Sequence, residues 1–266
     1  MQIKIEAREV PSKTWQVLSP IVALLVTAMC GILLFGLLGK SPFAALTTLF
    51  VAPLASFYGL TELAVKAAPI LLSAVGLAVC FQAKVWNIGV EGQFTMGAIF
   101  ASAVAILISQ MRIHLGVLLA IVAALLIWGL LAQTFFGFQV RVVGSSLPAA
   151  NYAGIERDRI IWLSLLISGG LAGLAGACEV LGPIGQLRPT ISPGYGYAAI
   201  IAAFIGRLNL LGIILSTLLL ALLYVGGELL QIKLTLPLAL AGVFQGILFL
   251  FFLAADFFIF NRIRIK

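Results

Sequence analysis

The stretch Val85-Trp86-Asn87-Ile88-Gly89-Val90-Glu91-Gly92-Gln93 places an acid, two amides and two glycines between largely apolar residues, 63–81 before it and 94–108 after it. A carboxylate is costly in hydrocarbon, so it normally faces the interior of a helix bundle or a water-filled path. Glycines let the backbone leave the helical conformation, and broken backbone survives at membrane depth only where it lines a cavity or is buried in protein. The stretch therefore predicts a discontinuous helix, broken near residues 85–93, beside a translocation path.

The composition predicts a helical membrane protein. The chain has 266 residues, of which 62% are hydrophobic and 9% are charged, whereas a soluble domain carries about 25% charged residues. Several charge-free stretches reach about 18 residues or more, which is long enough for a helix to cross the hydrocarbon core. These stretches are continuously apolar rather than alternating, so an all-α polytopic fold is expected instead of a β-barrel.

We expect about eight transmembrane or half-membrane helices within a single transmembrane domain over residues 1–266. The segment near 197–206 is too short to span the membrane as a straight helix. Residues 40–61 hold prolines and a glycine that are typical of an irregular outer loop or a short re-entrant turn. The predicted segments are 20–38, 62–82, 94–109, 115–138, 160–181, 197–206, 210–226 and 236–260.

The basic residues orient the chain. With both termini in the cytoplasm, 11 of the 16 Lys and Arg residues fall on the inner side: three before the first span, Lys84, three in residues 141–159, Arg207 and three after the last span. Cytoplasmic loops carry an excess of Lys and Arg, so the N- and C-termini are predicted to be cytoplasmic. A net charge of +7 could suggest a nucleic-acid partner. None is predicted, because no basic face is free of membrane. The single histidine, His114, is expected in an outer loop.

The sequence holds no pattern for catalysis or for a bound cofactor. Nothing matches the phosphate-binding loop G-x-x-x-x-G-K-[ST], and no His or Cys cluster has metal-ligand spacing. No Ser, His and acid are arranged for nucleophilic catalysis. The chain is therefore expected not to be an enzyme by itself and to carry no cofactor or metal.

Glu91 would lie in the first turn of the half-helix after the break, where the positive end of the helix dipole favours a carboxylate. Asn87 and Gln93 are expected to bond backbone groups that the break leaves free. Helical spacing places small and polar residues on one face of this helix, which predicts the lining of a path that water enters: Glu91, Thr95, Ala98 and Ser102. The alternative, which the sequence leaves open, makes Glu91 a buried structural acid bonded to backbone amides.

Two glycine-bounded segments occupy comparable places in the two halves of the chain. The first contains Gly89 and Gly92, and the second begins with Gly194 and Gly196, followed by Tyr197. Paired interrupted helices point to a transport site between repeats.

The predicted span 160–181 contains four closely spaced glycines: Gly169, Gly170, Gly173 and Gly176. Small residues at such spacing let a neighbouring helix approach closely. Their role is therefore expected to be structural.

Residues 142–159 form the main cytoplasmic loop. Ser146 can cap a short helix that starts at Leu147, and Gly154 suits the left-handed position that follows a helix. Leu147 and Tyr152 would be exposed on this helix. The pattern fits either a docking knob for a partner or an ordinary connecting loop, and both remain open on the pattern alone.

Three motifs resemble those of bacterial ABC importer permeases of the branched-chain amino acid, ribose and nucleoside superfamily, and the first is typical of the nucleoside branch linked to basic membrane proteins. Together they cover most of the chain from about Pro69 onward. The motifs are W-N-I-G-V-E-G-Q at 86–93 with Met96-Gly97-Ala98, F-G-F-Q-V-R-V-V-G at 136–144 with Ala149-Ala150 and Tyr152-Ala153-Gly154-Ile155, and Gly194-Tyr195-Gly196-Tyr197 with Ala199-Ile200 and Gly206.

The resemblance implies a permease subunit that moves a small polar solute, a nucleoside or a sugar-like compound, inward across the bacterial cytoplasmic membrane. The partners that it implies are cytoplasmic ATPase subunits, which bind the ATP, an extracytoplasmic solute-binding protein or lipoprotein, and a second, unlike permease subunit. In the family the second motif lies in the coupling loop, here residues 141–159, which docks on the ATPase. The residues that would carry this role are Arg141, Gly144, Ala149, Ala150, Tyr152, Ala153 and Gly154.

The chain departs from the family pattern in one place. Relatives carry an extra pair of helices and an outer loop where Ile108 here leads almost directly to His114. An ion-coupled secondary transporter or channel, with Glu91 coupling ions, and a non-functional truncated permease are the alternatives. A working short form must enclose a path with a second subunit, and the pairing surface is expected near residues 169–176 or along spans that the lost helices would have covered.

Overall fold

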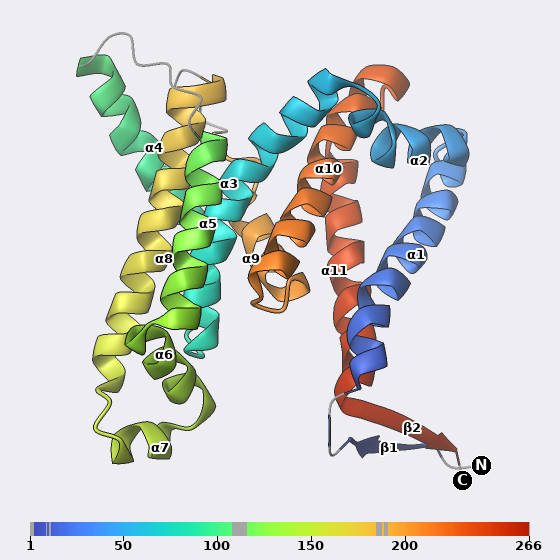
Figure 1. The fold of residues 1–266 in the computed structure, drawn as a ribbon. Helices are drawn as coiled ribbons and strands as arrows, with labels where there is room; N and C mark the ends of the chain where they lie inside the picture. Colours follow the sequence, from blue (N-terminus) through green and yellow to red (C-terminus); the bar gives the residue numbers. More distant parts are fainter. Residues whose placement is uncertain are drawn as a thin grey trace. The chain divides into compact units, whose positions relative to one another are not determined.

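The computed structural model describes residues 3–8, 10, 12–107, 116–184, 188 and 191–265. Within these ranges the chain is predominantly helical, which confirms the expected all-α membrane fold (Figure 1). Two short strands, which the sequence analysis did not predict, lie near the termini. The elements are β1 (Ile3–Ala7), α1 (Lys13–Leu37), α2 (Pro42–Phe50), η1 (Ala52–Leu54), α3 (Phe57–Gln82), α4 (Val90–Leu107), α5 (Gly116–Gln133), α6 (Phe135–Ser145), α7 (Leu147–Tyr152), α8 (Arg157–Glu179), η2 (Val180–Ile184), α9 (Tyr195–Ile205), α10 (Leu210–Leu234), α11 (Ala239–Phe260) and β2 (Asn261–Ile265).

Six helices in the described residues are long and apolar enough to cross a membrane: α1, α3, α5, α8, α10 and α11. Their large apolar side chains include many that are exposed, such as Leu33 and Leu166, as expected for surfaces that face lipid rather than water. Adding α4 and the short α9 reproduces the eight predicted segments. The chain is therefore a multi-pass membrane protein.

The chain forms two compact units. One comprises Met1–Leu60 and Leu222–Lys266, and the other comprises Thr61–Ala221. The second unit contains every residue that the sequence analysis selected for transport or docking. A single permease domain over residues 1–266 stays a prediction.

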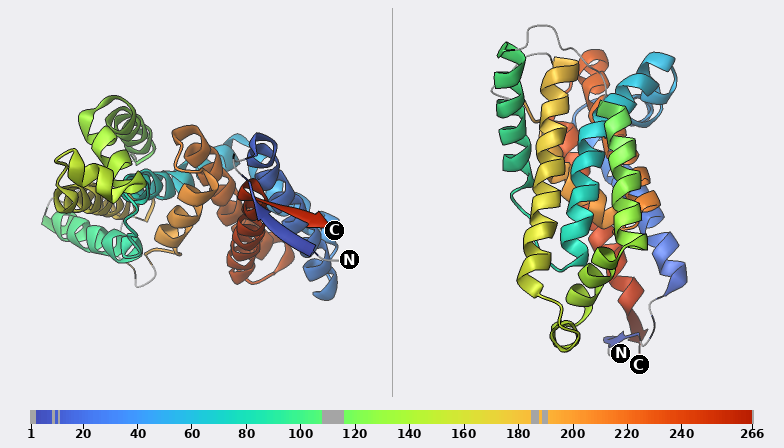
Figure 2. Two further views of the ribbon diagram at one scale, coloured as in Figure 1. Left: turned by 90° about the horizontal axis from the view of Figure 1, so that it is seen from below. Right: turned by 60° about the vertical axis from the view of Figure 1, so that its left-hand side comes forward.

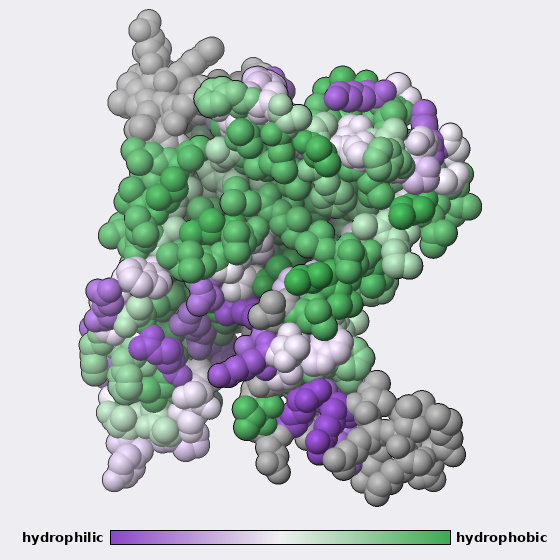
Figure 3. Space-filling view, turned by 45° about the vertical axis from the view of Figure 1, so that its right-hand side comes forward, coloured by the Kyte–Doolittle hydropathy of each residue, from purple (hydrophilic) through white to green (hydrophobic). Residues whose placement is uncertain are grey.

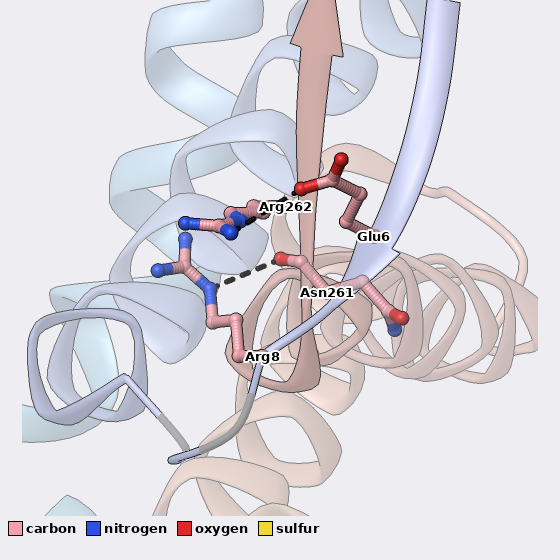
Figure 4. A network of polar contacts seen from close by, with 4 residues as sticks. All are labelled: Glu6, Arg8, Asn261 and Arg262. Carbon is pink, nitrogen blue, oxygen red and sulfur yellow. Dashed lines mark hydrogen bonds and ion pairs between the residues drawn. The ribbon is translucent and has the colours of Figure 1, made fainter.

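In the first unit, α1 packs against α11, and Phe35 stacks on Phe244 with ring centroids 5.4 Å apart. Strands β1 and β2 pair antiparallel beside them, with Glu6 opposite Arg262. The Arg262 guanidinium lies 3.2 Å from the Glu6 carboxylate, and Arg8 Nε donates to the carbonyl of Asn261 at 3.2 Å. Figure 4 shows both contacts. The pairing therefore brings residues 3–7 and residues 261–265 side by side.

The segment after α1 is ordered more regularly than its composition suggested. Ser41 precedes α2, which has Pro42 in its first turn, where a missing backbone N–H costs nothing. The short 3-10 turn η1 then leads towards α3. Residues 40–61 thus contain a nine-residue helix, whereas their composition predicted an irregular outer loop or a short re-entrant turn.

In the second unit, α4 lies alongside α8 (Figure 2). A Cβ atom on Gly97 would collide with the backbone of Gly173, and one on Gly176 would collide with the carbonyl of Phe94. The prediction that these glycines allow close helix approach is therefore confirmed at Gly173 and Gly176, whereas a Cβ on Gly170 would meet nothing within 4 Å. Helix α4 covers this face of α8, so Gly173 and Gly176 do not face a second subunit. The expectation of a pairing surface at residues 169–176 is therefore wrong for these two glycines.

The predicted span 115–138 is divided. Helix α5 ends at Gln133, and α6 begins after Thr134, whose hydroxyl accepts a hydrogen bond from the Gly137 N–H at 3.3 Å. A Cβ on Gly137 would collide with the carbonyl oxygens of Leu130 and Leu131, so this glycine lets α6 fold back against the end of α5. The expected junction at residues 108–114, including His114, lies outside the described residues.

Polar residues are concentrated at one end of the second unit. In Figure 3, hydrophobic residues cover the flanks of its helices, whereas hydrophilic residues gather towards the end that carries α6 and α7. Under the predicted orientation this is the cytoplasmic end.

Candidate translocation and coupling sites

The predicted break is present. Helix α3 ends at Gln82 and α4 begins at Val90, so residues 83–89 are not helical. The chain leaves α3 through Lys84, which has a left-handed φ of 59°, and the N–H of Val85 returns to the carbonyl of Cys80 at 2.9 Å. Helices commonly end with such a left-handed residue, although it is usually glycine.

Asn87 links the break to α8. Its side chain is buried, and its amide nitrogen lies 2.9 Å from both the Gln93 side-chain oxygen and the Ser168 hydroxyl. We expected Asn87 and Gln93 to bond backbone groups freed by the break. This is wrong for the two hydrogen bonds of the Asn87 amide, because both join it to other side chains. Ser168 was not selected from the sequence. The available signal was its position one helical turn after Ser164, on the face that packs inward.

The Glu91 carboxylate joins the two interrupted segments. It accepts a hydrogen bond of 2.7 Å from the backbone N–H of Gly196, the second residue of α9. Gly194 precedes α9 with a φ of 96°, which favours glycine. The contact places the carboxylate at the positive end of the α9 dipole. It favours the structural role for Glu91 that the sequence left open.

Gly196 has no room for a side chain. A Cβ there would lie 2.6 Å from the Glu91 carboxylate and 2.7 Å from both its Cα and its backbone nitrogen. Beside this contact, Phe94 meets the fully buried ring of Tyr195 edge-on, with centroids 6.0 Å apart. Tyr197 points elsewhere, since its side chain is 58% exposed.

The predicted polar stripe on α4 is interrupted. The Thr95 hydroxyl donates to the Glu91 carbonyl at 3.0 Å, and that of Ser102 donates to the Ile99 carbonyl at 2.7 Å. Between them, Ala98 is fully buried in an apolar cluster with Val180 and Ile191, so the stripe is not a continuous exposed lining.

The glycines of the first segment differ from Gly196 in their surroundings. Gly89 and Gly92 are exposed, and a Cβ on Gly92 would meet nothing within 4 Å. Gly89 accepts the Gln93 N–H at 3.0 Å in the first turn of α4.

An aromatic cluster that the sequence analysis missed connects the end of α3 with the end of α9. Phe81 stacks on Phe204 with centroids 4.9 Å apart, and Trp86 stacks on Phe204 at 5.4 Å. Gln82 also donates a hydrogen bond of 3.2 Å to the carbonyl of Leu208. These contacts thus hold the C-terminal ends of α3 and α9 together.

Residues 142–159 contain the predicted capped helix. Ser146 accepts from the Ala149 N–H at 3.3 Å, and Gly154 follows α7 with a φ of 69°. Tyr152 is 97% exposed and Leu147 is 40% exposed, as expected. Ala153 ends the helix and is also exposed.

Ala150 corrects the docking prediction. It is fully buried in an apolar cluster that includes Val79, Val140 and Ile160, so its side chain does not lie on a docking surface. Neighbouring residues on a helix point about 100° apart, and Ala149 accordingly stays exposed.

Two further loop residues attach α6 to the membrane helices. A Cβ on Gly144 would collide with the carbonyl of Gln82, so α6 packs directly on the end of α3. The Arg141 guanidinium donates to the carbonyl of Leu131 in α5. Helix α6 is thus in contact with the backbone at the start of the break.

A family model described as the branched-chain amino acid transport system permease component matches residues 59–124 and 99–253. The chain belongs to this permease family. The resemblance drawn from the three motifs is thereby confirmed.

Curated relatives of the permease include ABC transporter permeases with differing coverage. It is 24% identical to the glucose permease protein TsgB13 of Haloferax volcanii over 333 residues, covering 90% of this chain and 88% of the relative. It is 34% identical to the guanosine permease protein NupP of Bacillus subtilis over 142 residues, covering 53% of this chain but 40% of the relative. With the nucleoside permease protein NupC of Lactococcus lactis it shares 36% identity over 119 residues, covering 43% of this chain and 38% of the relative.

The chain has fewer residues than its alignment with the glucose permease protein of Haloferax volcanii has positions. The match to the glucose permease extends over 333 residues, whereas the whole chain has 266. That relative therefore contains residues with no counterpart here, in agreement with the absence of an internal segment. No solved structure matches the chain significantly.

Proposed function

We propose that the permease is the membrane subunit of an ABC importer that moves a nucleoside or a sugar-like solute inward across the bacterial cytoplasmic membrane. The observation that carries the proposal is the packing of Gly144 against Gln82. This contact connects the proposed coupling loop, residues 141–159, to the broken helix. The names of the relatives, which are permeases for glucose, guanosine and nucleosides, support the substrate class.

The proposed partners follow from this role. ATPase subunits would contact α7 in the cytoplasm, chiefly through Tyr152, and would bind the ATP, so this chain is not an enzyme by itself. A solute-binding protein or lipoprotein would deliver the substrate from outside. A second, unlike permease subunit would complete the path.

The proposed mechanism is mechanical. Movement of the ATPase against α7 passes through α6 to the contact between Gly144 and the end of α3. The break at 83–89 then moves together with α8, to which Asn87 ties it. Because Glu91 is bonded to Gly196, α9 moves with α4. We place Thr95 and Ser102, both half-buried, beside the path.

Uptake by reconstituted vesicles tests the proposal. The full chain is co-expressed with candidate ATPase, permease and lipoprotein subunits of an ABC importer from the same organism, and uptake of a nucleoside and sugar panel is measured with and without ATP. We expect ATP-dependent uptake that Tyr152→Ala reduces severely, while the matched control Trp162→Ala, an aromatic residue that is 74% exposed in α8, retains it.

Each other result supports an alternative. Uptake without the ATPase, driven by a proton or sodium gradient, would establish an ion-coupled transporter. A chain that inserts but neither holds the ATPase nor transports would be a truncated, non-functional permease.

A further inference from the structure

One cavity of the second unit is basic. It has a volume of about 710 Å³ and is lined by Lys84 after α3, Arg141 of α6 and Arg207 between α9 and α10. The described residues that line it include no Asp or Glu. Three cations around one hollow create a positive potential that favours an anion.

The backbone at two of these cations is unusual. Lys84 and Arg207 have left-handed φ angles of 59° and 53°, which few residues other than glycine adopt. Strained conformations of this kind gather at functional sites, where the surrounding structure holds them. Here the stacked rings of Phe81 and Phe204 and the hydrogen bond from Gln82 to Leu208 hold the two helix ends together.

The cavity changes from polar to apolar with depth. Along α3 its lining passes from Lys84 and Gln82 to Ala78 and Val75, towards the middle of the helix. Along α10 it passes from Asn209, just before the helix, to Ile213, one turn inside.

Helix α5 contributes only apolar wall, from Ala132 near its end to Ile127 more than one turn deeper. Trp128, which is 48% exposed, also lines this wall. This lining suits a ligand that carries an anionic head joined to an apolar body.

We propose that this cavity binds the phosphate headgroup of an anionic phospholipid of the cytoplasmic leaflet, with Lys84, Arg141 and Arg207 around the phosphate and the acyl chains against the deeper apolar wall. The predicted orientation places these cations at the cytoplasmic surface, where anionic lipids attract basic groups. Basic pockets between transmembrane helices on that side are suited to such headgroups. The site does not depend on the transported solute, because it rests on the charge and the depth profile of the cavity.

Lipid binding to the full chain in detergent micelles tests the site by native mass spectrometry. The probes are phosphatidylglycerol and phosphatidylcholine with identical acyl chains. We expect phosphatidylglycerol to bind at least tenfold more tightly. Lys84→Gln, which changes an exposed side chain, should weaken phosphatidylglycerol binding about fivefold, as expected from about 1 kcal/mol per basic residue near the membrane surface.

Two further variants control for folding and for general charge. Arg207→Gln should weaken phosphatidylglycerol binding like Lys84→Gln, so a folding defect in one variant leaves the other as a test. Arg159→Gln removes an exposed arginine of α8 that does not line the cavity, and binding should remain unchanged.

Three results would overturn the proposal. Equal affinity for the two lipids, or equal losses in Arg159→Gln and Lys84→Gln, would show that no specific headgroup site exists. Displacement of phosphatidylglycerol by millimolar inorganic phosphate would identify a soluble anion as the ligand. Loss of bound lipid on adding the purified ATPase would identify the cavity as a protein-docking surface.

Discussion

Replacing Gly196 by alanine tests whether the contact between Glu91 and α9 holds the two interrupted segments together. The added Cβ would lie 2.6 Å from the Glu91 carboxylate and 2.7 Å from its Cα and nitrogen. Two of these three atoms belong to the backbone of α4, so a rotation of the Glu91 side chain cannot relieve the overlap. Either α4 or α9 must move.

The size of the effect follows from two losses. Overpacking of a close contact costs about 1–3 kcal/mol, and a hydrogen bond to a charged group contributes about 1.5–3 kcal/mol. Because Glu91 is only half-buried, we take the lower part of the second range and expect a loss of about 3 kcal/mol in total. This exceeds the gain of up to about 1 kcal/mol that Gly→Ala gives in an ordinary helix.

The assay is the thermal midpoint of the detergent-solubilised protein, followed by fluorescence-detected size exclusion after heating. Gly196→Ala should lower the midpoint by several degrees. Gly92→Ala is the matched control, because a Cβ there meets nothing within 4 Å; it should leave the midpoint unchanged or raise it. Glu91→Gln, which removes the charge but keeps an acceptor oxygen, should lie between them. Equal midpoints for Gly196→Ala and Gly92→Ala would refute the reasoning.

Three further predictions concern packing and exposure. Ala150→Arg should prevent folding because it buries an unpaired charge, whereas Ala149→Arg should yield folded protein with weaker ATPase association. The yield of monodisperse protein and co-purification of the ATPase distinguish the two variants. A folded Ala150→Arg protein would contradict the buried position of Ala150. Gly176→Ala should lower the thermal midpoint by separating α4 from α8, while Gly170→Ala, where a Cβ meets nothing within 4 Å, should not; identical midpoints would speak against close packing there. Thr95→Cys, in a chain without its three native cysteines, should react with a small water-soluble thiol reagent, and protection of this position while a loop cysteine reacts would remove it from the path.

Several features of this protein followed from local chemistry alone. Long apolar runs with few charges determine a multi-pass helical membrane protein, because the backbone in hydrocarbon must satisfy its own hydrogen bonds. The break around Asn87 and the short α9 were predictable because glycines and polar residues interrupt those runs. The cap at Ser146 and the left-handed Gly154 follow from contacts between residues a few positions apart.

Other features depended on which segments meet in space. The sequence could not decide that Glu91 bonds Gly196, because 105 residues separate the two. It also could not show that α4 occupies the glycine face of α8, or that Ala150 turns inward while Ala149 stays exposed. Helical periodicity defines faces, but only the packing of helices distant in sequence decides which face is buried. For the same reason, three cations scattered over the chain as Lys84, Arg141 and Arg207 become one basic cavity only in the folded protein.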